Sequence, residues 1–388
     1  MLRPGLDSTV QHIQLREAVL SIARAAVAEG VTPGGVVAVA EGGESLLLLP
    51  FGRTQSHPGG AGDEVGRDTI YDIASLTKPV AASGVLMKLL EAGALSLDTP
   101  ARALVPELVA AGSEAITVAH LVGHSAGFPD HVKYYERLWS GDRAGAASAR
   151  EALVRMAGAT ALVDPPGRVT RYSDVGYILL GAALERAAGQ RLDRAAERLV
   201  LEPLAMRSTF FVDLEAPRRT WPPGAIAPTE VCSRRGLLEG EVHDENAHAA
   251  GGICAHAGLF STAGDLARFA GAMCAAVAGE PGHFDPAIAR RLTRTESTPG
   301  STWRLGWDTP ARASGVSHAG DRWPREGFGH LAFTGCSMWL DPARRRHVVL
   351  LTNRVHPTRQ GSGIRELRRA VMDAVVDHLD GAGITAGA

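Results

Sequence analysis

Strand patterns lie near both ends of this chain, and helical patterns fill the middle. Residues 36–40 and 45–49 are mostly apolar and flank the polar turn 41–44, which predicts a β-hairpin. Near the other end, residues 337–340 and 347–352 predict two further strands. The simplest fold that joins both ends is a single antiparallel sheet. We therefore expect an α/β architecture of the α+β type, with a helical region inserted into it.

Apolar residues recur at helical spacing in most of the remaining segments. Helices are predicted at residues 10–29, 75–90, 118–122, 146–157, 177–188, 192–200, 265–277 and 364–379. We expect residues 1–95 and 265–388 to form a sheet domain flanked by helices and residues 96–264 to form a helical and loop region, with the functional site in the cleft between them. The run 216–260 has little periodicity, and we expect it to shape the rim of that cleft.

The composition excludes several classes of partner. The formal net charge is −2, so the chain has no excess of positive charge that would attract nucleic acid or an anionic membrane. No apolar run is long enough for a signal peptide or a transmembrane helix, so we expect a soluble, cytoplasmic protein. Wide spacing predicts reduced thiols, rather than a disulfide or zinc framework, for Cys232, Cys254, Cys274 and Cys336.

Ser75 and Lys78 form the pattern Ser75-Leu76-Thr77-Lys78 at the start of a predicted helix. Side chains three residues apart share a helix face, so the amine reaches the hydroxyl. Only three of the 40 Lys and Arg residues are lysines, and a buried lysine, unlike an arginine, can lose its proton and act as a base. The pattern indicates a nucleophilic serine, although a helix N-cap beside a solvent-directed lysine also explains it.

Three motifs, in order, resemble those of serine β-lactamases and penicillin-binding proteins, in particular the class C β-lactamase and esterase branch. Segment 73–78 resembles the first, Ser-x-x-Lys motif. Tyr172-Ser173-Asp174 resembles the second, in which a tyrosine leads Tyr-x-Asn. His330-Leu331-Ala332 resembles the third, a Lys-Thr-Gly or His-Thr-Gly triplet on a strand. The resemblance extends from about residue 10 to 380 and implies the β-lactamase and transpeptidase fold.

The resemblance implies a role for each motif residue. Ser75 is expected to be the nucleophile that forms an acyl-enzyme, and Lys78 to share its proton with Ser75 and Tyr172. Beside a lysine, Tyr172 either ionises or passes a proton to the leaving group. The backbone N–H groups of Ser75 and Phe333 are expected to form the oxyanion hole. Contacts to substrate are expected from Asp174, His330, Leu331 and Ala332.

Two of these residues also have structural explanations. Tyr172 precedes a predicted helix, where a core tyrosine often satisfies its hydroxyl group locally. His330 lies near a predicted strand, where a lone histidine often has a structural role. The sequence alone leaves both explanations open.

The second and third motifs depart from the family pattern. Leu331 replaces the threonine whose hydroxyl group helps to bind a substrate carboxylate, and Ala332 adds a methyl group where glycine allows close backbone approach. Asp174 replaces an asparagine, and an ionised aspartate supplies no donor and repels a carboxylate. These changes favour a substrate that is less anionic than a penicillin, or differently shaped.

Acidic residues and histidines in the run 216–260 invite interpretation as a metal site. The residues concerned are His243, Asp244, Glu245, His248 and His256. Their spacing matches no standard metal site, and part of the run resembles the family's own loop. We therefore expect neither a metal nor a cofactor.

Together these observations predict a serine hydrolase of ester or amide bonds, either esterase-like or acting on small amides. The alternatives are a D,D-carboxypeptidase or weak β-lactamase, an acyltransferase that passes the acyl group to an alcohol, and a catalytically degenerate binding protein, which only Leu331 and Ala332 favour. In each case the expected partner is a small ester, amide or D-amino-acid-containing molecule, with no nucleic acid and no membrane.

Overall fold

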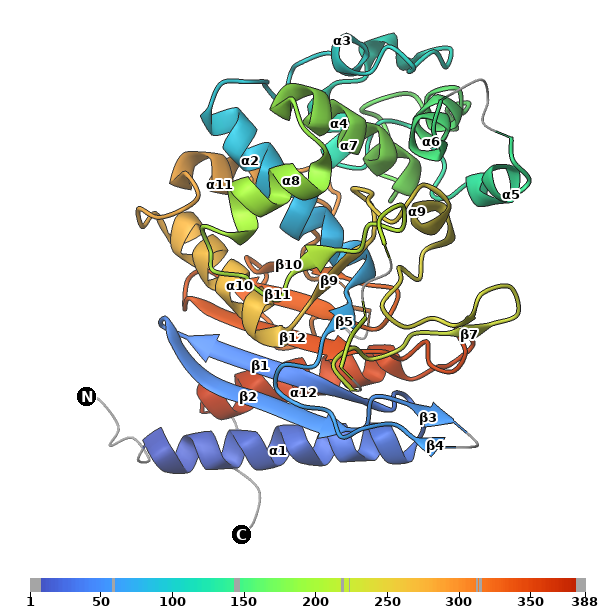
Figure 1. The fold of residues 1–388 in the computed structure, drawn as a ribbon. Helices are drawn as coiled ribbons and strands as arrows, with labels where there is room; N and C mark the ends of the chain where they lie inside the picture. Colours follow the sequence, from blue (N-terminus) through green and yellow to red (C-terminus); the bar gives the residue numbers. More distant parts are fainter. Residues whose placement is uncertain are drawn as a thin grey trace.

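A five-stranded antiparallel sheet is the main element of the fold (Figure 1). The computed structural model of the 388-residue chain describes residues 8–57, 60–142, 147–217, 220–222, 224–311, 313 and 316–381. The strand order is β10-β11-β12-β1-β2. The strands are β1 (Gly34–Glu41), β2 (Glu44–Gly52), β10 (Phe328–Leu331), β11 (Ser337–Asp341) and β12 (Arg346–Thr352). The two ends of the chain meet where β1 pairs with β12, so the predicted sheet is confirmed.

Helices cover both faces of this sheet. The helices α1 (Ser8–Ala28) and α12 (Ile364–Leu379) lie on one face and α10 (Ala263–Ala278) on the other (Figure 1). Along β1, Val37 and Val39 belong to the apolar cluster of α1 and α12, whereas Val36 and Ala38 belong to the cluster that contains α10. Burial on both faces explains why this strand is an almost continuous apolar run.

The chain between β2 and β10 contains ten α-helices among the described residues, joined by turns and loops. Its helices are α2 (Gly84–Glu91), α3 (Ala101–Leu104), α4 (Val118–Val122), α5 (Tyr134–Trp139), α6 (Ala149–Gly158), α7 (Asp174–Ala188), α8 (Leu192–Ala196), α9 (Glu245–Ala249), α10 and α11 (Pro286–Arg294). Residues 175–184 of α7 are all buried, because neighbouring helices surround it and its apolar residues occupy every side. The helical region predicted between the two halves of the sheet is therefore present.

The run 216–260 contains short elements that its weak periodicity did not predict. The strands β7 (Val231–Cys232) and β8 (Gly236–Leu237) form a hairpin, and α9 follows them. The strand β9 (Leu259–Ser261) lies between β5 (Tyr71–Asp72) and β6 (Phe210–Phe211). Strands of two or three residues are too short for a period-2 pattern to reveal them. Because β9 pairs with β5, this run is joined directly to the segment that precedes Ser75.

Most of the predicted helices are present, with shifted ends. Residues 118–122 and 364–379 match α4 and α12, and residues 265–277 lie within α10. The short helices α5 and α11 were missed, as was the two-stranded pair β3 (Ser56–His57) and β4 (Gly60–Ala61). Some positions of the predicted elements and domains lie outside the described residues. They include residue 146 of one predicted helix and both ends of the expected sheet domain, residues 1–7 and 382–388.

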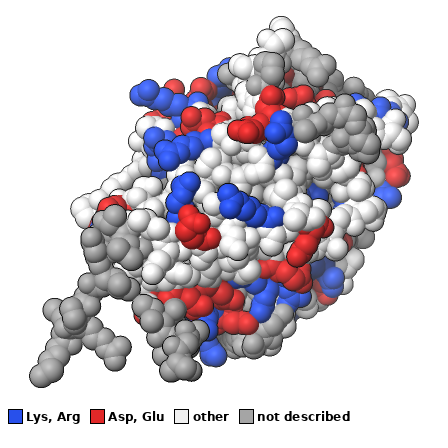
Figure 2. All heavy atoms as spheres, turned by 90° about the horizontal axis from the view of Figure 1, so that it is seen from below, with Lys and Arg blue, Asp and Glu red and all other residues white. Residues whose placement is uncertain are grey.

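Surface and cysteine features agree with the composition. On the face that Figure 2 shows, Lys and Arg side chains are interspersed with Asp and Glu, and neither sign forms a continuous patch. In the part of the chain that the structure describes, no helix is both long and apolar enough to cross a bilayer. All four cysteines are free thiols, and Cys254, Cys274 and Cys336 are buried, as predicted.

Candidate active site

Ser75 lies in a 3₁₀ turn (Ala74–Leu76) between β5 and a π-helical turn (Lys78–Ser83) that continues into α2. The residue before it, Ala74, has a φ of +42°, which is rare for a residue with a side chain and is found at constrained functional positions. Oδ1 of Asp72 accepts the N–H of Ala74 at 2.8 Å and holds this bend. The bend presents Ser75 to a cavity of about 740 Å³.

Two side chains converge on the hydroxyl oxygen of Ser75. The hydroxyl group of Tyr172 donates to Oγ of Ser75 at 2.8 Å, and Nζ of Lys78 donates to it at 3.3 Å. Tyr172 comes from the segment just before α7, where Ser173 is the N-cap and accepts the N–H of Gly176. The predicted trio therefore meets at one oxygen atom, although Tyr172 is 97 positions from Ser75 in sequence.

Lys78 has a stronger partner than Ser75. Its Nζ lies 2.7 Å from Oδ1 of Asp174 and donates to the carbonyl of His256 at 2.9 Å. Burial alone disfavours the ammonium, but the Asp174 carboxylate and, next to it, Tyr172 together outweigh burial and raise the pKa of Lys78. Burial works against the Asp174 carboxylate too, and Lys78 nevertheless holds the pKa of that carboxyl well below its ordinary range. The two groups therefore form a charged pair at neutral pH.

Tyr172 is a neutral phenol in this environment. Its ring centroid lies 4.8 Å from Nζ of Lys78. Burial raises the pKa of Tyr172 above its ordinary value, and the nearby Lys78 ammonium offsets this only in part. Of the two roles expected for Tyr172, the structure therefore favours passing a proton over resting as a phenolate.

His330 forms a wall beside Tyr172. Its ring centroid lies 6.2 Å from that of Tyr172 and 5.4 Å from that of Trp303. Nδ1 of His330 lies 2.8 Å from the carbonyl of Leu331, so Nδ1 carries the proton, since a carbonyl only accepts. Burial lowers the pKa of His330 to about 3. The ring is therefore neutral, and its other nitrogen has no partner among the described residues.

The remaining predicted site residues line the same cavity. Leu331 is half-buried and packs against the apolar cluster of α1 and α12, and Ala332 is buried. The side chain of Phe333 is 48% exposed. Among the described residues, the backbone N–H groups of Ser75 and Phe333 make no hydrogen bond to protein, so both are free for an oxygen of a bound molecule.

Sequence reasoning missed a second charged pair in the run 216–260. Nε2 of His256 lies 2.9 Å from Oδ1 of Asp244, and both residues line the cavity. Burial disfavours the imidazolium, yet Asp244 raises the pKa of His256 to about 10. The expectation that this run shapes the cleft was correct in outline, but its contact with Lys78 through the His256 carbonyl was not foreseen.

Two other histidines in this run, His243 and His248, each have a carboxylate partner of their own. Nε2 of His243 lies 3.2 Å from Oε2 of Glu230, and His248 lies 3.9 Å from Glu241. Within the described residues, no group of three or more His, Cys, Asp or Glu side chains is arranged to hold a metal ion.

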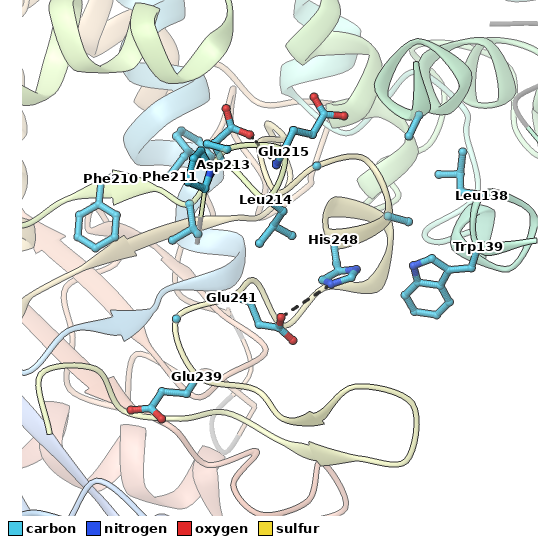
Figure 3. Close-up of a pocket in the computed structure, with 17 residues that line it drawn as sticks. Leu138, Trp139, Phe210, Phe211, Asp213, Leu214, Glu215, Glu239, Glu241 and His248 are labelled. Atoms are coloured by element: carbon cyan, nitrogen blue, oxygen red, sulfur yellow. Dashed lines mark hydrogen bonds and ion pairs between the residues drawn. The ribbon is translucent and has the colours of Figure 1, made fainter. Parts of the chain in front are cut away.

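A second cavity, also of about 740 Å³, lies beside α5 and α9 (Figure 3). Trp139, Phe211 and Leu214 form part of its wall, together with several carboxylates and the ion pair between His248 and Glu241. No described residue in its lining carries a hydroxyl, thiol or amine. Its described lining therefore has no serine, threonine, cysteine or lysine nucleophile, and the cavity that contains Ser75 is the candidate active site.

Comparisons with known proteins show the family and the fold of this chain. The family profile described as Beta-lactamase matches residues 19–372. A putative D-alanyl-D-alanine carboxypeptidase of Escherichia coli (strain K12) is 32% identical over 308 residues, which cover 74% of this chain and 70% of the relative. The solved structure of EstCE1, a hydrolase with promiscuous acyltransferase activity, has a TM-score of 0.73 and 21% identity, covering 94% of this chain and 99% of EstCE1. A family VIII carboxylesterase has a TM-score of 0.68 and 20% identity, covering 95% of this chain and 97% of the esterase.

Proposed function

The chain belongs to the beta-lactamase family, and we propose that it is a serine hydrolase in which Ser75 forms an acyl-enzyme. The observation that carries this proposal is the convergence of Tyr172 and Lys78 on Oγ of Ser75, in a cavity large enough for a small substrate. The free N–H groups of Ser75 and Phe333 support an oxyanion hole beside the same atom.

The charges of the site support a proton relay through a neutral tyrosine. As Oγ of Ser75 attacks the substrate carbonyl carbon, Tyr172 passes its own proton towards the leaving-group atom and takes up the Ser75 proton in the same step. The charged Lys78 stabilises the negative charge that develops on the Tyr172 oxygen during this transfer. Water then enters by the reverse route, releases the acyl group and restores both hydroxyl groups.

The cavity lining supports a small ester or amide whose acyl part carries no carboxylate. Leu331 replaces a hydroxyl group with an apolar side chain, and Ala332, Trp303 and Ile364 add apolar surface. Asp174 is already paired with Lys78 and offers no donor to an anionic substrate. An acyltransferase that delivers the acyl group to an alcohol would use the same residues, and product analysis in the presence of an alcohol separates the two activities.

The test of the proposed function is turnover of nitrophenyl acetate and butyrate by the wild type and by Ser75→Ala. We expect Ser75→Ala to abolish turnover and labelling by a fluorophosphonate probe, with an unchanged circular dichroism spectrum. Equal turnover by both proteins would show that Ser75 is not the nucleophile. Absence of both turnover and labelling in the wild type would favour the degenerate binding protein.

A D,D-carboxypeptidase or weak β-lactamase is the second candidate, supported by the 32% identical carboxypeptidase relative. Arg354 and Arg359 line the cavity, and a guanidinium suits the terminal carboxylate of a peptide. Release of D-alanine from a D-alanyl-D-alanine peptide, or a penicillin adduct on Ser75 in an intact mass spectrum, would favour this candidate over the esterase.

A further inference from the structure

Arg368 is a buried arginine that contacts a single turn of the backbone. It lies on α12, is 5% exposed and lines the cavity that contains Ser75. Its Nε donates to the carbonyl of Gly335 at 3.1 Å, and its Nη2 donates to those of Ala332 at 2.8 Å and Cys336 at 2.9 Å. Three carbonyls of the turn 332–336 therefore converge on one guanidinium.

Burying Arg368 in this way costs free energy of folding. Among the described residues, no carboxylate forms an ion pair with Arg368, and a buried guanidinium without one is strongly disfavoured. Burial lowers the pKa of Arg368 to about 10, so the side chain is still a cation at neutral pH. An apolar residue could fill the same space. The buried positive charge therefore indicates a functional role for Arg368.

The peptide group between Ala332 and Phe333 connects this charge to the active site. A peptide group is planar and trans, so its C=O and N–H point in opposite directions. Arg368 and the N–H of Gly335 hold the Ala332 carbonyl, at 2.8 and 3.1 Å. The other end of the same group is the free N–H of Phe333. A cation at the carbonyl end also polarises the group and makes its N–H more positive.

The same turn is tied to the segment that carries Ser75. Oγ1 of Thr334 donates to the carbonyl of Asp72 at 2.9 Å. Gly335 has a φ of +108°, and a Cβ added there would lie 2.1 Å from a neighbouring hydroxyl oxygen, so the turn accepts only glycine at that position. The turn is therefore fixed on both sides of Phe333, with the N–H groups of Phe333 and Ser75 held in one framework.

We propose that Arg368 is a positioning residue for the oxyanion hole: its guanidinium orients and polarises the 332–333 peptide group, so that the N–H of Phe333 binds the carbonyl oxygen of a substrate attacked by Ser75. This inference rests on the proposed function, because it requires a tetrahedral intermediate on Ser75. Negative charge develops on that oxygen during the attack, so a fixed and polarised N–H stabilises the transition state more than the ground state.

The experiment compares matched oxygen and thiono esters of one nitrophenyl substrate, with Arg368→Gln, Arg368→Lys and the wild type. Sulfur accepts hydrogen bonds weakly, so an effective oxyanion hole favours the oxygen ester. We expect Arg368→Gln to lower kcat for the oxygen ester by ~10- to 100-fold with KM nearly unchanged, and to lower the ratio of oxygen to thiono turnover by a similar factor. Arg368→Lys keeps the charge and should retain an intermediate ratio.

Arg346→Lys is the matched control, because Arg346 is also a buried arginine. It pairs with Glu41 and Asp380 at the start of β12, the end of the strand away from the turn 332–336. This variant should leave the ratio at the wild-type value. An equal loss of oxygen and thiono turnover in Arg368→Lys would overturn the proposal and make the contacts of Arg368 purely structural. A rise in KM confined to substrates with a carboxylate would also overturn it, by placing Arg368 in contact with substrate. Ser75→Ala, measured alongside, shows separately whether the proposed function itself fails.

Discussion

The Nζ of Lys78 lies 2.7 Å from Oδ1 of Asp174 but 3.3 Å from Oγ of Ser75. The carboxylate therefore favours the protonated form of the lysine, and we propose that Lys78 acts as a stationary positive charge rather than as a neutral base. Asp174 also opposes ionisation of Tyr172, because its negative charge raises the pKa of that phenol. The residue at the asparagine position of the second motif thus raises the pKa of both Lys78 and Tyr172.

The first prediction is that Asp174→Asn shifts the pH dependence of turnover towards lower pH. An ionised Tyr172 takes the Ser75 proton without first giving up its own, so kcat/KM of the wild type should rise as pH approaches and passes the ordinary tyrosine value of about 10. Removing the Asp174 charge lowers the pKa of both Tyr172 and Lys78. The alkaline limb of kcat/KM should therefore move down by about one pH unit. Superimposable profiles would show that Asp174 does not set these pKa values.

The second prediction concerns the hydroxyl group of Tyr172. Tyr172→Phe removes the only O–H that donates to Oγ of Ser75 among the described residues, so kcat should fall by ~10²- to 10⁴-fold. The melting temperature should change little, since the ring contacts with His124 and Trp303 are retained. Tyr134→Phe is the control, because Tyr134 is a buried tyrosine whose hydroxyl group pairs with Thr160 outside the site. Similar losses in the two variants would argue against a proton relay through Tyr172.

The sheet and the pair Ser75 and Lys78 were predictable because each leaves a local pattern. The hairpin 34–52 consists of two mostly apolar runs around a polar turn, and Ser75 and Lys78 are close in sequence. Tyr172 was found only through its motif, since nothing local indicates that it meets Ser75. The contact of Asp174 with Lys78 depends on how α7 packs against the turn 78–83, and that of His256 with Asp244 on how the run 216–260 crosses the cleft. Long-range packing of this kind has no periodic signal.

Arg368 illustrates the same limit. In sequence it is one arginine among many on a predicted helix. Helical spacing aligns it with the apolar residues Ile364, Met372 and Val376, but does not indicate what its guanidinium contacts. Only the packing of α12 against the sheet brings its guanidinium under the turn 332–336. The third motif identified this turn, but the sequence did not indicate what holds its carbonyls.

The third prediction is that the double substitution Leu331→Thr and Ala332→Gly increases acylation by penicillin. Threonine would return a hydroxyl group to the strand beside Ser75, and glycine would remove the methyl group that narrows the approach to the backbone. A rise of ~10-fold or more in the rate of adduct formation is expected, in line with one added hydrogen bond to a charged group. Intact mass spectrometry over time measures it. Each single variant serves as a control, and a double variant no faster than the wild type would show that these two residues do not exclude penicillins.

The last prediction is that His256→Gln destabilises the protein by an amount that depends on pH. The unfolded-state pKa of histidine is about 6.5, and pairing with Asp244 raises the pKa of His256 to about 10 in the folded protein. A raised pKa contributes stability that is complete below pH 6.5 and is lost progressively as pH rises towards 10. The variant should therefore unfold more easily than the wild type by about 3 kcal/mol at pH 6, and the difference should shrink as the pH increases. Denaturant titrations at several pH values measure it.

His347→Gln is the matched control, because burial lowers the pKa of His347 to about 4. The wild type therefore loses the stability contributed by His347 as pH falls below 6.5, which is the opposite direction. A pH-independent difference for His256→Gln would contradict a charged pair between His256 and Asp244.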